Sequence, residues 1–183
     1  MLEVGCWDGH FLPSLLENFH EVWAIDDDSA SSVEASRGCW TILQVARRLC
    51  ESETISTANL RLTKATGTAL PFRDGYFDVV FCIDTLVHVP RSSRTDFIRE
   101  LSRVTTSGGQ LIFCLPIEIG PVRVLRQMAR IVTRKQIDPS SRHYDFRADL
   151  QLLRSMFALC EQRFIPVGVL GSLNPFVVVN CRT

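Results

Sequence analysis

The sequence predicts an α/β protein, a three-layer α/β/α sandwich around a mostly parallel sheet of about seven strands. Residues 77–83 and 110–115 form nearly continuous apolar runs of strand length, which are typical of parallel strands covered by helices on both faces. A helical pattern over 94–104 separates the two runs, as in the strand–helix–strand unit of α/β proteins. Apolar segments at 164–170 and 176–179 flank a turn, so an antiparallel hairpin is expected at the C-terminal end.

The other expected elements continue the alternation of strand and helix along the chain. One helical stretch is expected to be interrupted at Gly38, because glycine weakens a helix interior. No internal repeat or low-complexity linker is visible, so the sequence indicates a single domain over residues 1–183. These elements are strands at 1–4, 21–25 and 60–63, and helices at 11–16, 29–51, 121–135 and 148–160.

Composition limits the classes of partner and location. The chain has 183 residues, 46% of them hydrophobic, which is enough for a substantial core. Its 20 basic and 20 acidic residues balance, so no nucleic-acid partner is expected. No apolar stretch reaches the length of a bilayer span, and the N-terminus lacks the pattern of a secretion signal. A cytoplasmic protein without a transmembrane segment is therefore expected, and the oligomeric state stays open.

The cysteines give no sign of a metal centre. The seven cysteines are scattered, odd in number and never spaced as Cys-x-x-Cys, so neither a zinc site nor a disulfide framework can be read from the pattern. Most of them are expected to be small buried hydrophobes in a reducing compartment. No metal is expected.

The first strand-to-helix turn and the end of the second strand predict a nucleoside site. Gly5 and Gly9 allow backbone N–H groups to approach a ligand, and Asp26, with Asp27 beside it, stands where an acid can accept both ribose hydroxyls. Gly5 and Asp26 are 21 positions apart, close to the separation that this geometry requires. The simpler alternative, a turn that merely needs glycine, explains the glycines but not the acid.

The spacing of the turn favours one nucleoside over another. A dinucleotide site needs glycine at i, i+2 and i+5 to receive the pyrophosphate, and here those positions hold Gly5, Trp7 and His10. S-adenosylmethionine has no phosphate and carries an α-ammonium, which favours an acid such as Glu3 at the end of the first strand. The sequence therefore predicts S-adenosylmethionine and disfavours a nicotinamide cofactor.

Four segments in order resemble a known family. They resemble the class I S-adenosylmethionine-dependent methyltransferases, in particular the type 11-like group of quinone-pathway and small-molecule enzymes. Each motif alone is weak, but together they span roughly residues 2–116. The segments are Leu2–Gly9, Val22–Asp26, Ala69–Val80 with its continuation Asp84–Val89, and Glu100–Val104 with Ser107–Ile112.

The resemblance implies a Rossmann-like fold and assigns parts of the chain. Residues 1–116 would form the cofactor-binding core, 117–147 a substrate-recognition insertion, and 148–183 the last helix and strand hairpin. The implied reaction is methyl transfer to a small-molecule or carrier-linked acceptor, with positioning as the main source of rate. The implied cofactor-binding residues are Glu3, Gly5, Cys6, Trp7, Gly9, Asp26, Asp27, Thr66, Gly67, Thr68 and Asp84.

Several of these residues have a second interpretation. His88, just past the fourth strand, is a candidate base or substrate contact, and equally a residue that packs in the following turn. Asp84 either touches the methionine end of the cofactor or caps the next helix. His143 is the second candidate base, within a run Arg142–Asp145 that either lines an acceptor pocket or ties the chain down. For 66–68, contact with adenine and loop solvation are equally open.

The chain departs from the family pattern in three places, and two of them, Trp7 and the missing N-terminal helix, favour an alternative function. Trp7 replaces the usual glycine and could face solvent, rest on the cofactor or fill the site. Thr66 stands where many relatives carry an acid for the adenine amino group. The helix that often precedes the first strand is missing, so the chain is either a fragment or has an unusually open pocket. The alternative is a non-catalytic methyltransferase-like binding domain with a degenerate cofactor site.

Residues 121–135 have a basic amphipathic pattern. The simpler interpretation is a solvated cationic face. The other interpretation is contact with an anionic substrate, a carrier or a membrane surface.

Overall fold

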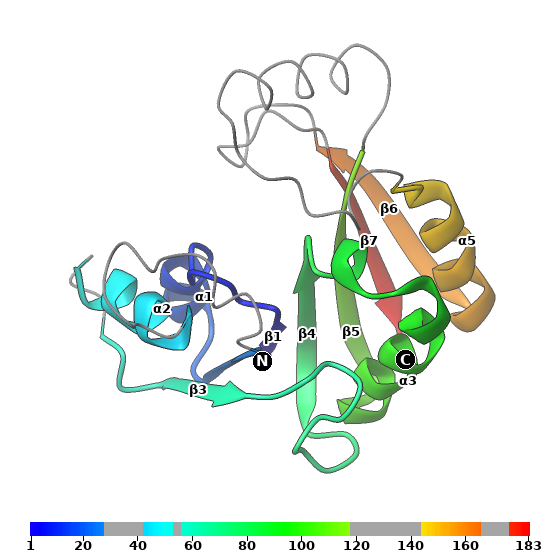
Figure 1. Cartoon of the computed structure of the whole chain (residues 1–183). Helices are drawn as coiled ribbons and strands as arrows, with labels where there is room; N and C mark the ends of the chain where they lie inside the picture. The colour runs from blue at the N-terminus through cyan, green and yellow to red at the C-terminus, as the bar shows by residue number, and fades with distance from the viewer. Residues whose placement is uncertain (28–41, 53–55, 118–143, 166–175) are drawn as a thin grey trace, which may run out of the picture.

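The computed structural model describes residues 1–27, 42–52, 56–117, 144–165 and 176–183. Within them, one seven-stranded sheet has the order β3-β2-β1-β4-β5-β7-β6 (Figure 1). The strands are β1 (Leu2–Val4), β2 (Val22–Asp26), β3 (Leu60–Lys64), β4 (Phe77–Ile83), β5 (Thr105–Pro116), β6 (Leu159–Ile165) and β7 (Phe176–Arg182).

The direction of the strands confirms the expected mixed sheet. β1 lies between β2 and β4 and is parallel to both, and β3 and β5 extend the parallel part on either side. β7 is antiparallel to β5 and to β6. The carboxyl ends of β1 to β5 therefore meet at one edge of the sheet, where open α/β sheets bind ligands.

Helices cover both faces of the sheet, which confirms the three layers (Figure 1). α1 (Leu12–Asn18) and α2 (Ile42–Ser52) lie on one side, against β2 and β3. α3 (Arg94–Val104) and α5 (Phe146–Met156) lie on the other, against β5 and β6. α1 begins early enough that Pro13 falls in its first turn, where its missing N–H costs nothing.

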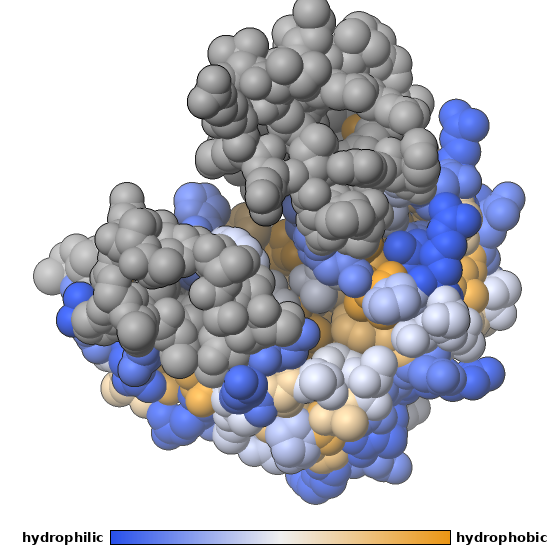
Figure 2. Space-filling view, in the orientation of Figure 1, coloured by the Kyte–Doolittle hydropathy of each residue, from blue (hydrophilic) through white to orange (hydrophobic). Residues whose placement is uncertain are grey.

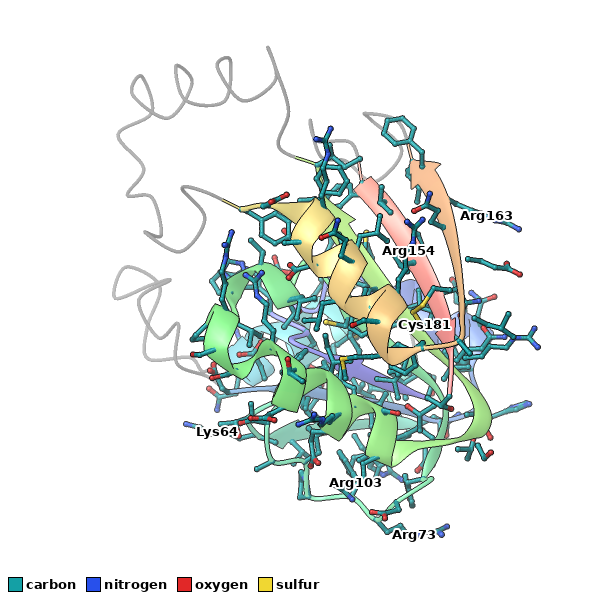
Figure 3. All side chains as sticks on the ribbon, turned by 90° about the vertical axis from the view of Figure 1, so that its right-hand side faces the viewer. Lys64, Arg73, Arg103, Arg154, Arg163 and Cys181 are labelled. Carbon is teal, nitrogen blue, oxygen red and sulfur yellow. A yellow bond between two sulfur atoms is a disulfide. The ribbon has the colours of Figure 1, made fainter. Side chains whose placement is uncertain are left out.

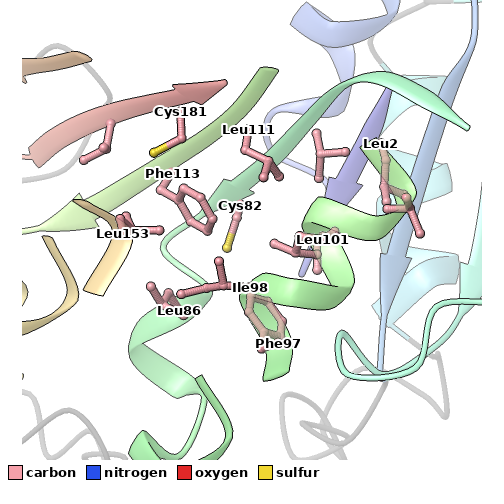
Figure 4. Close-up of a cluster of buried hydrophobic side chains, with 14 of the residues drawn as sticks. Leu2, Cys82, Leu86, Phe97, Ile98, Leu101, Leu111, Phe113, Leu153 and Cys181 are labelled. Carbon is pink, nitrogen blue, oxygen red and sulfur yellow. The ribbon is translucent and has the colours of Figure 1, made fainter. Parts of the chain in front are cut away.

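The larger part of the core lies between β4, β5 and the helices α3 and α5. Figure 4 shows Phe113 and Cys82 on the strands facing Ile98 and Leu101 on α3, with Leu153 of α5 beside them. These side chains are buried, so the apolar runs of the sequence form strands of the core, as predicted.

Two strand boundaries differ from the prediction. The helix expected over 148–160 ends at Met156, and β6 begins at Leu159. The start of β6 was not predicted, because this edge strand carries exposed polar side chains and so shows no apolar pattern. These side chains are Glu161, Gln162 and Arg163. β5 begins at Thr105 rather than at 110, with a register shift against β4. The first half of the helix expected at 29–51, the helix expected at 121–135 and the turn of the hairpin lie outside the described residues.

The cysteines of the described part include one bonded pair. Cys160 of β6 and Cys181 of β7 are directly opposite each other and form a disulfide. The scattered cysteine pattern did not predict this bond, because the pairing follows from strand register. The free cysteines among the described residues are buried, as expected for small hydrophobes: Cys6, Cys50, Cys82 and Cys114.

Two features are absent from the described residues. No helix there is long and apolar enough to cross a membrane. No group of three or more His, Cys, Asp or Glu side chains is arranged there to hold a metal ion.

Candidate functional site

The turn after β1 is fixed against the neighbouring strand ends. The N–H groups of Gly5 and Cys6 both donate to the carbonyl of Ile25, at 2.8 and 3.1 Å. Gly5 has φ +76° and Gly9 has φ +80°, a conformation that glycine adopts at little cost. A Cβ on Gly5 would also collide with the hydroxyl of Thr85. Both glycines are therefore required by the shape of the turn.

Asp26 ends β2 beside this turn, where its carboxylate is buried. The N–H of Trp7 donates to Oδ2 of Asp26 at 3.0 Å, which fixes the carboxylate relative to the glycine turn. Asp27 is exposed immediately beyond the strand. The acid and the turn that the sequence placed in one site are thus adjacent.

Glu3 lies inside the sheet at the end of β1, with only 2% of its surface exposed. Its Oε2 has no hydrogen-bond partner among the described residues. Burial, assisted by the negative charge of Asp8, raises the pKa of Glu3 from 4.5 to about 8. A buried carboxylate oxygen without a partner is costly, so a cation or a hydrogen-bond donor beside Oε2 would stabilise the ionised form of Glu3.

Trp7 does not occupy an enclosed space. Its indole keeps 45% of its surface exposed, although its backbone has φ +45°. Of the three orientations open from the sequence, filling the site does not fit this exposure.

The end of β4 completes the edge on the other side of β1. Asp84 is exposed and has φ +52°, and its N–H donates to the carbonyl of Cys114 at 3.0 Å. His88 is exposed at the end of the 3-10 turn η2 (Leu86–His88). η2 begins two residues after Asp84, with Thr85 at its N-cap position, and both interpretations of Asp84 stay predictions.

Thr85 is the residue that the sequence reasoning missed. Its hydroxyl donates toward the carbonyl of Val4 at 2.9 Å and lies within 3.4 Å of the carbonyl of Gly5. It thereby joins the end of β4 to the glycine turn. The available signal was its place directly after the fourth strand, next to Asp84.

The segment after β3 carries the positions expected near adenine. Thr66 and Thr68 are exposed at this edge, and Thr66 forms a β-bridge with Ala69. A Cβ on Gly67 would overlap the ring of Phe97. Gly67 therefore has a packing reason of its own, in addition to any contact with a ligand.

Two of the family-like motifs hold each other in place. The carboxylate of Glu100 on α3 accepts the N–H of Leu70 at 2.7 Å. Arg103 donates to the carbonyls of Leu70 and Phe72 and pairs with Asp74 at 2.7 Å. Figure 3 shows Arg103 and Arg73 at the end of the molecule where this loop lies. The signature at 69–78 is thus held to α3 by these contacts, and its family-like residues have a structural role away from the carboxyl ends of the strands.

Residues 2–113 match the family model described as "Methyltransferase domain". The chain belongs to this methyltransferase family. It has the class I architecture of the S-adenosylmethionine-dependent enzymes, and S-adenosylmethionine is the cofactor of this family. The resemblance stated from the motifs is confirmed.

Solved methyltransferase structures share the fold. A SAM-dependent methyltransferase from Aquifex aeolicus superimposes with a TM-score of 0.67 at 19% identity, covering 100% of this chain and 81% of that chain. Magnesium protoporphyrin IX methyltransferase from Synechocystis PCC 6803, with bound SAH, gives 0.65 at 13% identity, covering 100% and 73%. At such identities the likeness is one of fold.

A curated methyltransferase is similar over a short segment. Sarcosine/dimethylglycine N-methyltransferase of Halorhodospira halochloris is 43% identical over 49 residues. The match covers 27% of this chain and only 17% of that enzyme's length.

The run Arg142–Asp145 is described only in its second half. The ring of Tyr144 lies under the guanidinium of Arg94, 5.6 Å from ring centre to Cζ, and Asp145 accepts the N–H of Arg147 at the start of α5 (3.1 Å). Arg94 in turn pairs with buried Asp149 at 2.6 Å. Tyr144 therefore packs against Arg94 of α3, whereas Asp145 caps the N-terminus of α5. His143 lies outside the described residues.

Proposed function

We propose that this chain transfers a methyl group from S-adenosylmethionine to a small-molecule or carrier-linked acceptor. The observation that supports the proposal most is Glu3, a buried carboxylate whose Oε2 has no partner among the described residues. It lies at the same sheet edge as Gly5 and Asp26. The α-ammonium of S-adenosylmethionine would supply the missing charge and donor.

Each residue of the edge has one task in this proposal. When bound, S-adenosylmethionine supplies a sulfonium methyl that is already activated, with a neutral thioether as the leaving group. Glu3 binds the ammonium, and Asp26 accepts the ribose hydroxyls while the Trp7 N–H keeps its carboxylate in position. Gly5 and Gly9 let the backbone, with Cys6 between them, approach the ligand.

The remaining predicted contacts extend the site on both sides. Thr66, Gly67 and Thr68 face the adenine end beyond β3, with Asp27 beside the ribose, and Asp84 faces the methionine end beyond β4. Residues 1–116 form the cofactor-binding core in this proposal. Residues 117–147 select the acceptor and 148–183 complete the sheet.

His88 is the proposed base for acceptors that must lose a proton. It is exposed at the ligand edge, just after β4, where it can reach an acceptor rather than the core. We expect His88→Asn to lower kcat for an acceptor that must be deprotonated, and to leave S-adenosylmethionine binding unchanged. His143 stays the second candidate, outside the described residues.

A nitrogen acceptor is the first class to screen. The Halorhodospira halochloris relative is named for methylation of sarcosine and dimethylglycine, which supports small amines as starting compounds. Because that match is short, the screen should include phenols and carrier-linked acids.

The binding half of the proposal is tested by calorimetric titration with S-adenosylmethionine and S-adenosylhomocysteine. We expect Asp26→Asn to weaken binding at least about tenfold, since a buried charged acceptor is lost. Asp78→Asn is the matched control, because that acid is exposed near the start of β4, at the opposite edge of the sheet, and it should change binding little. A folded wild-type sample that binds neither ligand would instead support the non-catalytic alternative.

A further inference from the structure

β6 forms one edge of the sheet, and no described strand pairs with its outer side. Two of its large apolar residues are exposed, Leu159 by 64% and Phe164 by 63%. An open edge presents unpaired N–H and C=O groups and is a template for another strand. The sequence of this strand determines which partner fits.

Two observations show which residues of β6 point their backbone groups outward. Cys160 and Cys181 have Cα atoms 4.3 Å apart, the separation of a non-hydrogen-bonded antiparallel pair. On the other side of β7, the N–H of Thr183 donates to the carbonyl of Gly109 of β5. The odd-numbered residues of β7 therefore point their backbone N–H and C=O groups toward β5. Both observations leave the same β6 residues with outward N–H and C=O groups: Cys160, Gln162 and Phe164.

The side chains of β6 divide between two faces. Gln162 accepts a hydrogen bond from Arg154 of α5 (3.1 Å), so the even-numbered residues face that helix. Glu161 and Arg163 lie on the opposite face, and Figure 3 shows Arg163 extending from β6 away from α5. Both are exposed, and neither has an ion-pair partner among the described residues.

The strand is complementary to itself when it is turned around Gln162. An antiparallel copy centred there places Gln162 opposite Gln162 and Cys160 opposite Phe164, which are the residues with outward backbone groups. Glu161 then lies opposite Arg163 on both sides of the axis, in non-hydrogen-bonded pairs where side chains approach most closely. Leu159 meets Ile165 at each end of the same face. In this register the backbone hydrogen bonds, the opposite charges and the apolar side chains are all paired.

We propose that a second copy of this chain pairs with β6 antiparallel about a twofold axis at Gln162, joining the two sheets into one. Protective edge strands usually carry charges that repel a second copy, whereas Glu161 and Arg163 attract it. An isologous contact of this kind closes as a dimer.

Sedimentation equilibrium tests the dimer, at concentrations from roughly 1 to 100 µM, because an interface built on one strand pair is small. We expect the wild-type chain to dimerise in this range. Arg163→Glu and Glu161→Arg should each weaken dimerisation at least about tenfold, because each places like charges opposite each other. Arg47→Glu on α2 is the matched control, an exposed arginine away from β6, and should change nothing.

Mixing the two charge variants separates pairing from misfolding. Arg163→Glu and Glu161→Arg chains are complementary to each other, so their mixture should form heterodimers at concentrations where each variant alone is mainly monomeric. Gln162→Pro is a second variant, because its lost N–H points outward and the β6–β7 ladder stays complete; it should be folded and monomeric. A monomeric wild type, or a dimer that both charge reversals and Gln162→Pro leave intact, would overturn the proposal.

Discussion

The buried carboxylate of Glu3 makes the strongest prediction about stability. Burial raises its pKa from 4.5 in the unfolded chain to about 8 in the folded one, so the folded state keeps a proton that the unfolded state releases. The folded state therefore loses relative stability as the pH rises from about 4.5 to 8. Linkage converts this difference to about 3 kcal/mol near pH 7 and about 5 kcal/mol above pH 8.

Glu3→Gln removes this titration while keeping the shape of the side chain. The free energy of unfolding of the variant should no longer fall between pH 4.5 and 8, whereas that of the wild type should. The amide lowers the free energy of unfolding by an amount that does not depend on pH, because its own atoms stay unpaired. The quantity to compare is therefore the slope of the free energy of unfolding against pH. Urea unfolding followed by circular dichroism, at several pH values without cofactor, measures it.

Binding of S-adenosylmethionine should lower the raised pKa of Glu3. An ammonium beside Glu3 lowers the pKa of that carboxyl, so at about pH 6–7, where the free protein holds this proton and the complex does not, the wild type should release close to one proton when it binds the cofactor. Titration calorimetry in buffers of different ionisation enthalpy measures that release, and Glu3→Gln should abolish it. Equal pH slopes for wild type and variant, together with no proton release, would refute the reasoning. Asp78→Asn is the control, since this exposed acid at the start of β4 lies away from the proposed site and does not contribute to the raised pKa of Glu3.

Three further substitutions test the packing around the site. Gly5→Ala should destabilise the fold by about 1–3 kcal/mol and abolish cofactor binding, since the left-handed φ and the Thr85 hydroxyl both exclude a methyl group; thermal unfolding and calorimetry measure the two effects. Trp7→Gly should raise the free energy of unfolding by up to about 1–2 kcal/mol by relieving a φ of +45°, and an unchanged or lower value in urea unfolding would contradict this. Arg94→Met should cost about 3–5 kcal/mol because Asp149 is left buried without its partner, and adding Asp149→Leu should recover most of that loss in the same assay.

The cofactor edge could be predicted from the sequence because its signals are local. The glycines of the first turn need a left-handed backbone, which Gly5 and Gly9 have, and an acid at a strand end is visible in any strand-length apolar run. Parallel strands then bring Glu3, Gly5 and Asp26 to one edge whatever the loops between them. The roles of these residues in binding stay predictions until the titrations are made.

The features that could not be predicted depend on register and on side-chain reach. The Cys160–Cys181 bond requires the two residues to be opposite each other in β6 and β7, and nothing in the spacing of the cysteines encodes that pairing. The hydroxyl of Thr85 reaches the glycine turn only because β4 lies next to β1. Such contacts belong to the assembled sheet, and a single sequence carries no direct sign of them.

The backbone of Trp7 and Asp84 explains why the most conspicuous departure from the family pattern is tolerated. They are the non-glycine residues with positive φ in the described part of the chain, and both stand at the ligand edge. A left-handed tryptophan costs roughly 1–2 kcal/mol, but the same conformation directs its N–H to the carboxylate of Asp26, and a charge-assisted hydrogen bond is worth about as much. The turn thus keeps the conformation that glycine would adopt there, and the indole stays nearly half exposed beside it. A substitution that looks disabling in the sequence leaves the backbone of the site intact, which is why Trp7→Gly is expected to add stability while the hydrogen bond to Asp26 is kept.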